Sequence, residues 1–232
     1  RRYFIYDAKG RLEATIDATG AVAQFVYDGA DRIVETRSYA NRITPQASWW
    51  TGTPPASLWR SDALGIPPGN ALVVTVDAAQ DRIVQTTYDS AGRLSTETVL
   101  GADASQTRKT TYTYDAASRL LQVSVTDGVN TAATARTTRY LYDAADRQIA
   151  TIDALNYVTE TVYDFGGRVV KTIRYANVSG SPAATTLAAL RPGTSTKDQI
   201  TRYFYDGRGN QTGVLESIGD ANTEGYLTEV VY

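Results

Sequence analysis

The 232 residues of this chain include no cysteine and no histidine. The chain therefore has no thiolate or imidazole ligand for a metal, no cysteine nucleophile, and no histidine base to activate a serine. No disulfide can cross-link the fold. Carboxylate chemistry and a serine–lysine pair remain open on composition alone, but no arrangement of residues points to either. We therefore expect no enzymatic activity, no metal and no cofactor.

Long apolar runs are also missing, since stretches such as residues 71–74 are far shorter than the roughly 20 residues that a helix needs to cross a bilayer. This predicts no membrane-spanning segment. Basic and acidic residues, 23 and 25 of them, are interspersed and give a net charge of -2. A nucleic-acid site requires a clustered basic face, so no nucleic-acid partner is expected.

The residues that are abundant are turn formers and strand formers. Arginine supplies 19 of the basic residues, aspartate supplies 18 of the acidic residues, and there are 16 tyrosines. The short aspartate carboxylate accepts backbone N–H groups in turns, and the planar arginine fork stacks on aromatic rings and pairs with carboxylates. The composition predicts chemistry that is almost entirely structural.

A Tyr-Asp dipeptide recurs in a fixed frame, usually followed by two variable residues, a turn former and arginine. The seven copies begin at Tyr6, Tyr27, Tyr88, Tyr114, Tyr142, Tyr163 and Tyr205. A repeat of this kind indicates one supersecondary unit stacked many times. Because the chain starts and stops within the pattern, we expect residues 1–232 to be one continuous segment of a longer array.

A larger repeat is superposed on the small one. The first block, residues 6–41, aligns without a gap with the second block, residues 142–177, at an offset of 136, and about half of the positions are identical. Each block holds a further aspartate, Asp17 or Asp153, midway between its two Tyr-Asp copies. The small repeat is therefore a hairpin unit with two kinds of turn.

The expected fold class is all-β, an antiparallel β-hairpin repeat array of about fifteen strands. Aspartate at the first position and glycine at the last suit a four-residue turn, and strands of five to eight residues fit between turns. Asp31 and Asp146 replace the glycine, because aspartate tolerates left-handed backbone geometry. The repeat arginines are expected to stack on tyrosines of the adjacent hairpin.

Two excursions interrupt the rhythm, one at about residues 42–70 and the other at about residues 178–199. The second carries signals for a short helix, with Ser181-Pro182 at its start and Pro192-Gly193 at its end. We expect both to pack on the sheet or to cover an edge.

The first excursion contains the only residues that we single out for ligand contact, namely Trp49, Trp50 and Trp59. Aromatic side chains on a loop can stack on a sugar or hold an extended peptide. The alternative, which we favour, is that they anchor a long loop by burying aromatic area. The repeat aspartates are separated by alanine and lack the close spacing of a calcium loop, so turn capping is the favoured role for them.

The motif YDxxGRL stands intact at residues 6–12 and 88–94, is relaxed at four other copies, and fails at residues 205–210, where Asn210 replaces arginine. These copies resemble the YD-repeat family, also called RHS repeats. The resemblance implies a long curved or spiralling sheet that forms part of a hollow shell. In bacterial RHS proteins and in toxin-complex B/C components such a shell encloses a C-terminal toxic polypeptide, whereas in teneurins it serves adhesion. No stretch matches the family's self-cleavage segment.

On this resemblance we expect a structural segment of a bacterial shell that encapsulates and shields a toxin-like cargo. Its partners would be the remainder of the same polypeptide and the C-terminal cargo, and its location would be secreted or at the cell surface. The alternative is an extracellular adhesion or glycan-binding module that binds a cell-surface glycan or protein through the three tryptophans.

Overall fold

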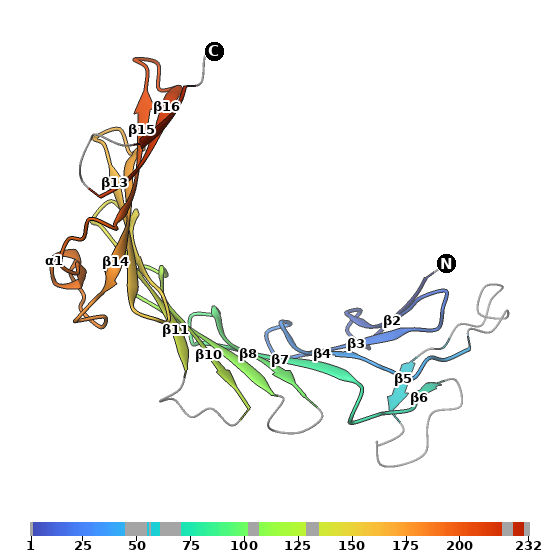
Figure 1. Ribbon diagram of the computed structural model, residues 1–232. Helices are drawn as coiled ribbons and strands as arrows, with labels where there is room; N and C mark the ends of the chain where they lie inside the picture. Colours follow the sequence, from blue (N-terminus) through green and yellow to red (C-terminus); the bar gives the residue numbers. More distant parts are fainter. Residues whose placement is uncertain are drawn as a thin grey trace. The chain divides into compact units, whose positions relative to one another are not determined.

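The computed structural model describes residues 2–44, 55, 57–60, 71–101, 107–128, 135–219 and 225–229, with the backbone alone for Trp59 and for residues 225–229. Within these residues the chain is almost entirely β-structure (Figure 1). Its elements are β1 (Tyr3–Tyr6), β2 (Leu12–Ile16), β3 (Val22–Tyr27), β4 (Ile33–Ser38), β5 (Ser57–Arg60), β6 (Ala71–Val74), β7 (Arg82–Tyr88), β8 (Leu94–Leu100), β9 (Arg108–Tyr114), β10 (Leu120–Asp127), β11 (Arg136–Tyr142), β12 (Gln148–Ile152), β13 (Tyr157–Tyr163), β14 (Val169–Val178), α1 (Leu187–Leu190), β15 (Gln199–Tyr205), β16 (Gln211–Ile218) and β17 (Gly225–Glu229).

The chain divides into two compact units, one of residues 1–111 and 125–135 and the other of residues 112–124 and 136–232. In the first unit the strands follow the order β1-β2-β3-β4-β7-β8, and in the second β11-β12-β13-β14-β15-β16-β17. Neighbouring strands in both series pair antiparallel. The predicted all-β array of antiparallel hairpins is confirmed. Its treatment as one continuous domain stays a prediction.

A β-bulge interrupts the ladder at the same place in six of the seven Tyr-Asp hairpins. In the first hairpin Ile5 pairs with Ala14 but Tyr6 pairs with Leu12, so the register shifts at the tyrosine. The corresponding shift occurs at Tyr27, Tyr88, Tyr142, Tyr163 and Tyr205. An extra residue in a left-handed conformation after a tight turn produces this kind of bulge. The repeat motif therefore encodes a turn and a bulge together.

One sheet face in each unit is buried against the excursion that follows the block. In the first unit, Ile5, Ala14, Ile16 and Val22 of the sheet form a core with Tyr39, with Leu58 of the excursion, and with Leu72 and Val74 of β6, which directly follows the excursion. In the second, Ala150, Ile152, Val158 and Tyr175 form a core with Leu190 of α1. Strands β2 and β12 have the same alternation, with Ala14 and Ile16 or Ala150 and Ile152 buried.

The structure of the excursions differs from the prediction in two details. Strand β5, in the first excursion, pairs in parallel with β6, which lies beyond the predicted end of the excursion at about residue 70, and the composition did not indicate this pair. The helix of the second is a single turn with Thr186 at its N-cap, so the start predicted at Ser181-Pro182 is wrong. Ser181 instead begins a separate turn, in which its carbonyl accepts the N–H of Ala184 at 2.9 Å.

Candidate functional site

The Tyr-Asp turns are closed by a repeated set of contacts that uses both carboxylate oxygens of the aspartate. In the first copy, Asp7 Oδ1 accepts the backbone N–H groups of Lys9 and Arg11, each at 2.9 Å. Its Oδ2 accepts Arg11 Nε at 2.7 Å, and its carbonyl accepts the N–H of Gly10 at 2.9 Å. The backbone N–H and side chain of the arginine bind the aspartate in the same way at Asp28, Asp89, Asp115, Asp143 and Asp164.

These contacts keep the repeat carboxylates ionised. The pKa of Asp7 is lowered from its ordinary value, first by the hydrogen bond from the backbone N–H of Arg11 and further by the Arg11 side chain. The same leading cause, the N–H of the arginine four residues on, lowers the pKa of Asp28, Asp89, Asp115, Asp143 and Asp164. The repeat aspartates are thus occupied as turn caps, which supports their predicted role.

The last turn position has a positive φ in every copy, as the motif predicts. Glycine fills it at Gly10, Gly92, Gly167 and Gly209, with φ between 80° and 91°. Asp31 and Asp146 adopt φ of 61° and Ser118 adopts 65° at the equivalent places. The predicted substitution of aspartate for glycine at this position is confirmed.

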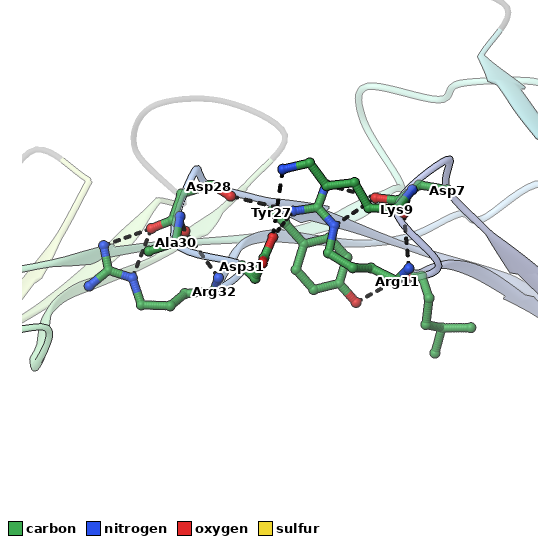
Figure 2. Close-up of polar contacts among 9 residues, drawn as sticks. Asp7, Lys9, Arg11, Tyr27, Asp28, Ala30, Asp31 and Arg32 are labelled. Atoms are coloured by element: carbon green, nitrogen blue, oxygen red, sulfur yellow. Dashed lines mark hydrogen bonds and ion pairs between the residues drawn. The ribbon is translucent and has the colours of Figure 1, made fainter.

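Five of the repeat arginines also contact the next copy along the array, as Figure 2 shows for Arg11 and Tyr27. The guanidinium of Arg11 lies 4.6 Å from the ring centroid of Tyr27, and the hydroxyl of that tyrosine donates to the carbonyl of Leu12 at 2.9 Å. The same two contacts join Arg32 to Tyr88, Arg119 to Tyr142, Arg147 to Tyr163 and Arg168 to Tyr205. The predicted stacking is confirmed, and the tyrosine hydroxyl adds a neutral hydrogen bond worth about 1 kcal/mol.

The aspartates at the left-handed position have a second role that the sequence did not reveal. Asp31 Oδ1 accepts Arg11 Nη1, and Asp146 Oδ1 accepts Arg119 Nη1 at 2.7 Å. Each carboxylate therefore binds the arginine of the preceding copy. At two of the glycine positions the preceding arginine still lies close, since a Cβ would be 3.5 Å from Arg32 Nη1 on Gly92 and 3.6 Å from Arg168 Nη1 on Gly209. Successive turns are thus joined along one edge in each unit.

Both excursions are attached to their blocks by equivalent hydrogen bonds. Where the chain leaves each block, the N–H groups of Ala40 and Ala176 donate to the buried carboxylates Asp81 and Asp198 at 2.9 and 2.8 Å. Each of these aspartates stands directly before the strand at which the chain rejoins the sheet, β7 or β15. Neither aspartate was singled out from the sequence, although the position of each directly before a strand was the available signal.

The second excursion is further held by a buried carboxylate. Glu160 on β13 accepts Arg191 Nε at 2.7 Å, Arg191 Nη2 at 2.6 Å and the hydroxyl of Tyr175 at 2.7 Å. Burial acts to raise the pKa of Glu160, but these hydrogen bonds outweigh it and the pKa is lowered. In the first block Gln24 replaces the glutamate and accepts the hydroxyl of Tyr39 at 2.6 Å. The contact between the buried Glu160 and Arg191, which we call the arginine clamp, is therefore a feature of the second excursion.

The structure leaves the three tryptophans untested as ligand contacts. Trp49 and Trp50 lie outside the described residues, and Trp59 lies on β5 with its backbone alone described. Within the part of the chain that the structure describes, no group of three or more histidine, cysteine, aspartate or glutamate side chains is placed to hold a metal ion. No helix among the same residues has the length and apolar character needed to cross a membrane.

The family model described as RHS Repeat matches residues 6–44, so the predicted resemblance to the YD/RHS repeat is confirmed. No curated protein matches the chain.

Solved structures with the same fold are the crystal structures of TcdB2-TccC3-Cdc42 and TcdB2-TccC3, each with 17% identity and a TM-score of 0.60. The Tc holotoxin pore of Photorhabdus luminescens is similar at 16% identity, also with a TM-score of 0.60. In all three, 98% of this chain is covered, but it spans only about a tenth of the length of the matched chains.

Proposed function

We propose that this chain is a structural wall segment of a YD/RHS-repeat shell that encloses and shields a toxin-like C-terminal cargo. The observation that carries the proposal is the coupling of consecutive copies through arginine, tyrosine and, in places, aspartate, as in the contacts of Arg11 with Tyr27 and Asp31. Such coupling joins consecutive hairpins within each unit into one sheet. The fold shared with structures that contain TcdB2 and TccC3 supports the same role.

The physical basis of shielding is the closed hydrogen-bond ladder of the hairpins. Inner strands such as β13, β14 and β15 each lie between two neighbouring strands, so none of them presents a sheet edge to which an enclosed polypeptide could add. A cargo on either face would meet side chains only. A wall of this kind can hold an unfolded chain without adding it to the sheet. The secreted or cell-surface location and the absence of enzymatic activity are parts of this proposal.

The test is protease protection in the longest natural polypeptide that contains this chain. One version carries a specific protease site in the C-terminal region, and a matched control carries the same site in the exposed turn at Phe165. Enclosure predicts rapid cutting at the turn and no cutting at the C-terminal site until the protein is denatured. Equal cutting at both sites under native conditions would contradict the shell.

The adhesion or glycan-binding alternative through Trp49, Trp50 and Trp59 stays a prediction. Replacement of all three tryptophans by alanine, followed by a cell-binding or glycan-array measurement, tests it directly. Loss of binding with an unchanged melting temperature would support it, and unchanged binding would remove its basis.

A further inference from the structure

A groove lies on the face of β13, β14 and β15 that points away from the core of the second unit. Val158, Glu160, Tyr175 and Ile200 alternate onto the core face and are buried, so the residues between them occupy the opposite face. Two adjoining depressions there, of ≈ 320 and ≈ 460 Å³, are both lined by Tyr157, Arg174 and Gln199. They form one groove, which also includes Lys197 and a row of threonines.

The groove forms where the register of the sheet changes. Thr159 pairs with Arg174, but Tyr157, two residues earlier, pairs with Val178, so β14 carries two extra residues at this point. The ladder between β14 and β15 ends at the pair of Arg174 and Gln199. A bulge bends its strand and redirects side chains, and bulges recur beside binding sites.

Three polar side chains of the groove, those of Tyr157, Arg174 and Lys197, differ from the side chains of the repeat turns in having no partner among the described residues. Among the described residues, Tyr157 and Arg174 make no side-chain hydrogen bond, and Arg174 and Lys197 form no ion pair, whereas the repeat tyrosines and arginines are paired. The ring of Tyr157 is 37% exposed. Asp153, on the rim, already uses Oδ1 to accept two backbone N–H groups at 2.9 Å. The groove therefore offers two cations, an aromatic ring and free amide and hydroxyl groups.

The first block holds different residues in the same backbone frame. At the offset of 136, Ala21, Ala23 and Ser38 correspond to Tyr157, Thr159 and Arg174. The backbone contacts are kept, because the N–H of Ile43 donates to the carbonyl of Gly20 at 2.9 Å just as the N–H of Ser179 donates to that of Asn156. The fold does not require these side chains, since the first block forms the same hairpins without them.

We propose that this groove is a binding site for an acidic saccharide, a sugar residue that carries a carboxylate. The carboxylate would be held by the fork of Arg174 and the ammonium of Lys197, the sugar ring would stack on Tyr157, and its hydroxyls would bind Gln199 and the threonines. An extended peptide that adds as a further strand is disfavoured, because β13, β14 and β15 each lie between two neighbouring strands and none of them is a sheet edge.

The experiment is calorimetric titration of the 232-residue chain with digalacturonic acid, with lactose as the neutral probe and diglutamate as the acidic peptide probe. The proposal predicts binding of digalacturonic acid and at least about ten-fold weaker binding of the other two. Diglutamate binding of equal strength would overturn it in favour of a peptide or a general anion site. Absence of digalacturonic acid binding would also overturn it.

The variant that tests the residues copies the first block, with Tyr157→Ala, Thr159→Ala and Arg174→Ser together. It should fold, as judged by circular dichroism and melting temperature, and lose binding. Arg174→Lys should recover part of the affinity, because charge is retained but the fork is lost. The matched control is Arg82→Gln. Arg82 is the residue of the first unit that corresponds to Gln199, so this variant gives the first unit the glutamine that the second unit already has. Equal weakening by that control would show unspecific charge attraction and refute the site.

Discussion

Replacing Arg191 by leucine should destabilise the second unit by removing the counter-charge of a buried carboxylate. The Glu160 side chain is 3% exposed and the Arg191 side chain is 48% exposed. Truncating one partner of a fully buried pair costs about 3–5 kcal/mol, whereas a surface pair is worth at most about 1 kcal/mol. Because one partner is buried and the other is half in solvent, we expect a loss of about 2–3 kcal/mol in the free energy of unfolding. For a chain of this size that lowers Tm by roughly 4–12 °C.

The dependence of this loss on pH identifies its cause. In the native protein the pKa of Glu160 is below its ordinary value of 4.5, so the stabilisation is present above pH 4.5 and is lost as the pH falls through the lowered pKa. In Arg191→Leu, burial is no longer balanced by the arginine and the pKa of Glu160 should rise. The difference in Tm between the two proteins should therefore be large at pH 7 and should narrow as the pH approaches 4.

A double-mutant cycle with Glu160→Gln completes the test. Glutamine is the residue that the first block uses at this position, where Gln24 accepts the hydroxyl of Tyr39. With glutamine present there is no buried charge to leave unpaired, so adding Arg191→Leu should cost less than about 1 kcal/mol. Equal losses in the glutamate and glutamine backgrounds, or a loss that does not vary between pH 7 and pH 4, would refute the reasoning.

Three further predictions concern the repeat turns. Tyr163→Phe should keep the stacking on Arg147 but lose the hydrogen bond to the carbonyl of Gln148. A urea titration should therefore show an unfolding free energy lower by about 1 kcal/mol. A loss larger than that caused by Tyr163→Ala would contradict this prediction. Gly20→Ala should cost more than Gly10→Ala when their Tm values are compared, because a Cβ on Gly20 would stand 1.7 Å from a backbone oxygen whereas one on Gly10 meets nothing within 4 Å. The repeat aspartates have folded-state pKa values below their ordinary value of 3.8, so their stabilisation is present above that pH and is lost below it. Tm should therefore decline between pH 4 and pH 2, and an unchanged Tm over that range would contradict the turn-capping account.

Features encoded within a few residues were predictable. Asp7 and Gly10 lie within one turn, and the demand for a positive φ can be inferred from the residue types alone. Stacking of Arg11 on Tyr27 was also predictable, because the repeat places the same pair at every junction between copies. The acceptor role of Asp31 toward Arg11 was missed, because the residue already had a sufficient explanation as a glycine substitute.

Features that join distant parts of the chain were not predictable. The arginine clamp joins Glu160 to Arg191 across 31 residues, and nothing in the local sequence of either residue predicts its contact with the other. The same holds for the pairing of β5 with β6 and for the groove at Tyr157, which depends on a register shift between β13 and β14. A helix predicted from Ser181 became a single turn that begins after Thr186, because packing of Leu190 in the core selects the helical residues.

The sequence by itself determined the hairpin unit, its turns and the periodic contact between arginine and tyrosine. These features follow from short-range geometry, which recurs in every copy of the repeat. Only the tertiary structure decided how the excursions are held, which carboxylates are buried and where a face of the sheet opens into a groove. Those outcomes depend on which residues meet across large sequence separations, and the free energy of such contacts is set by burial and register rather than by any local motif.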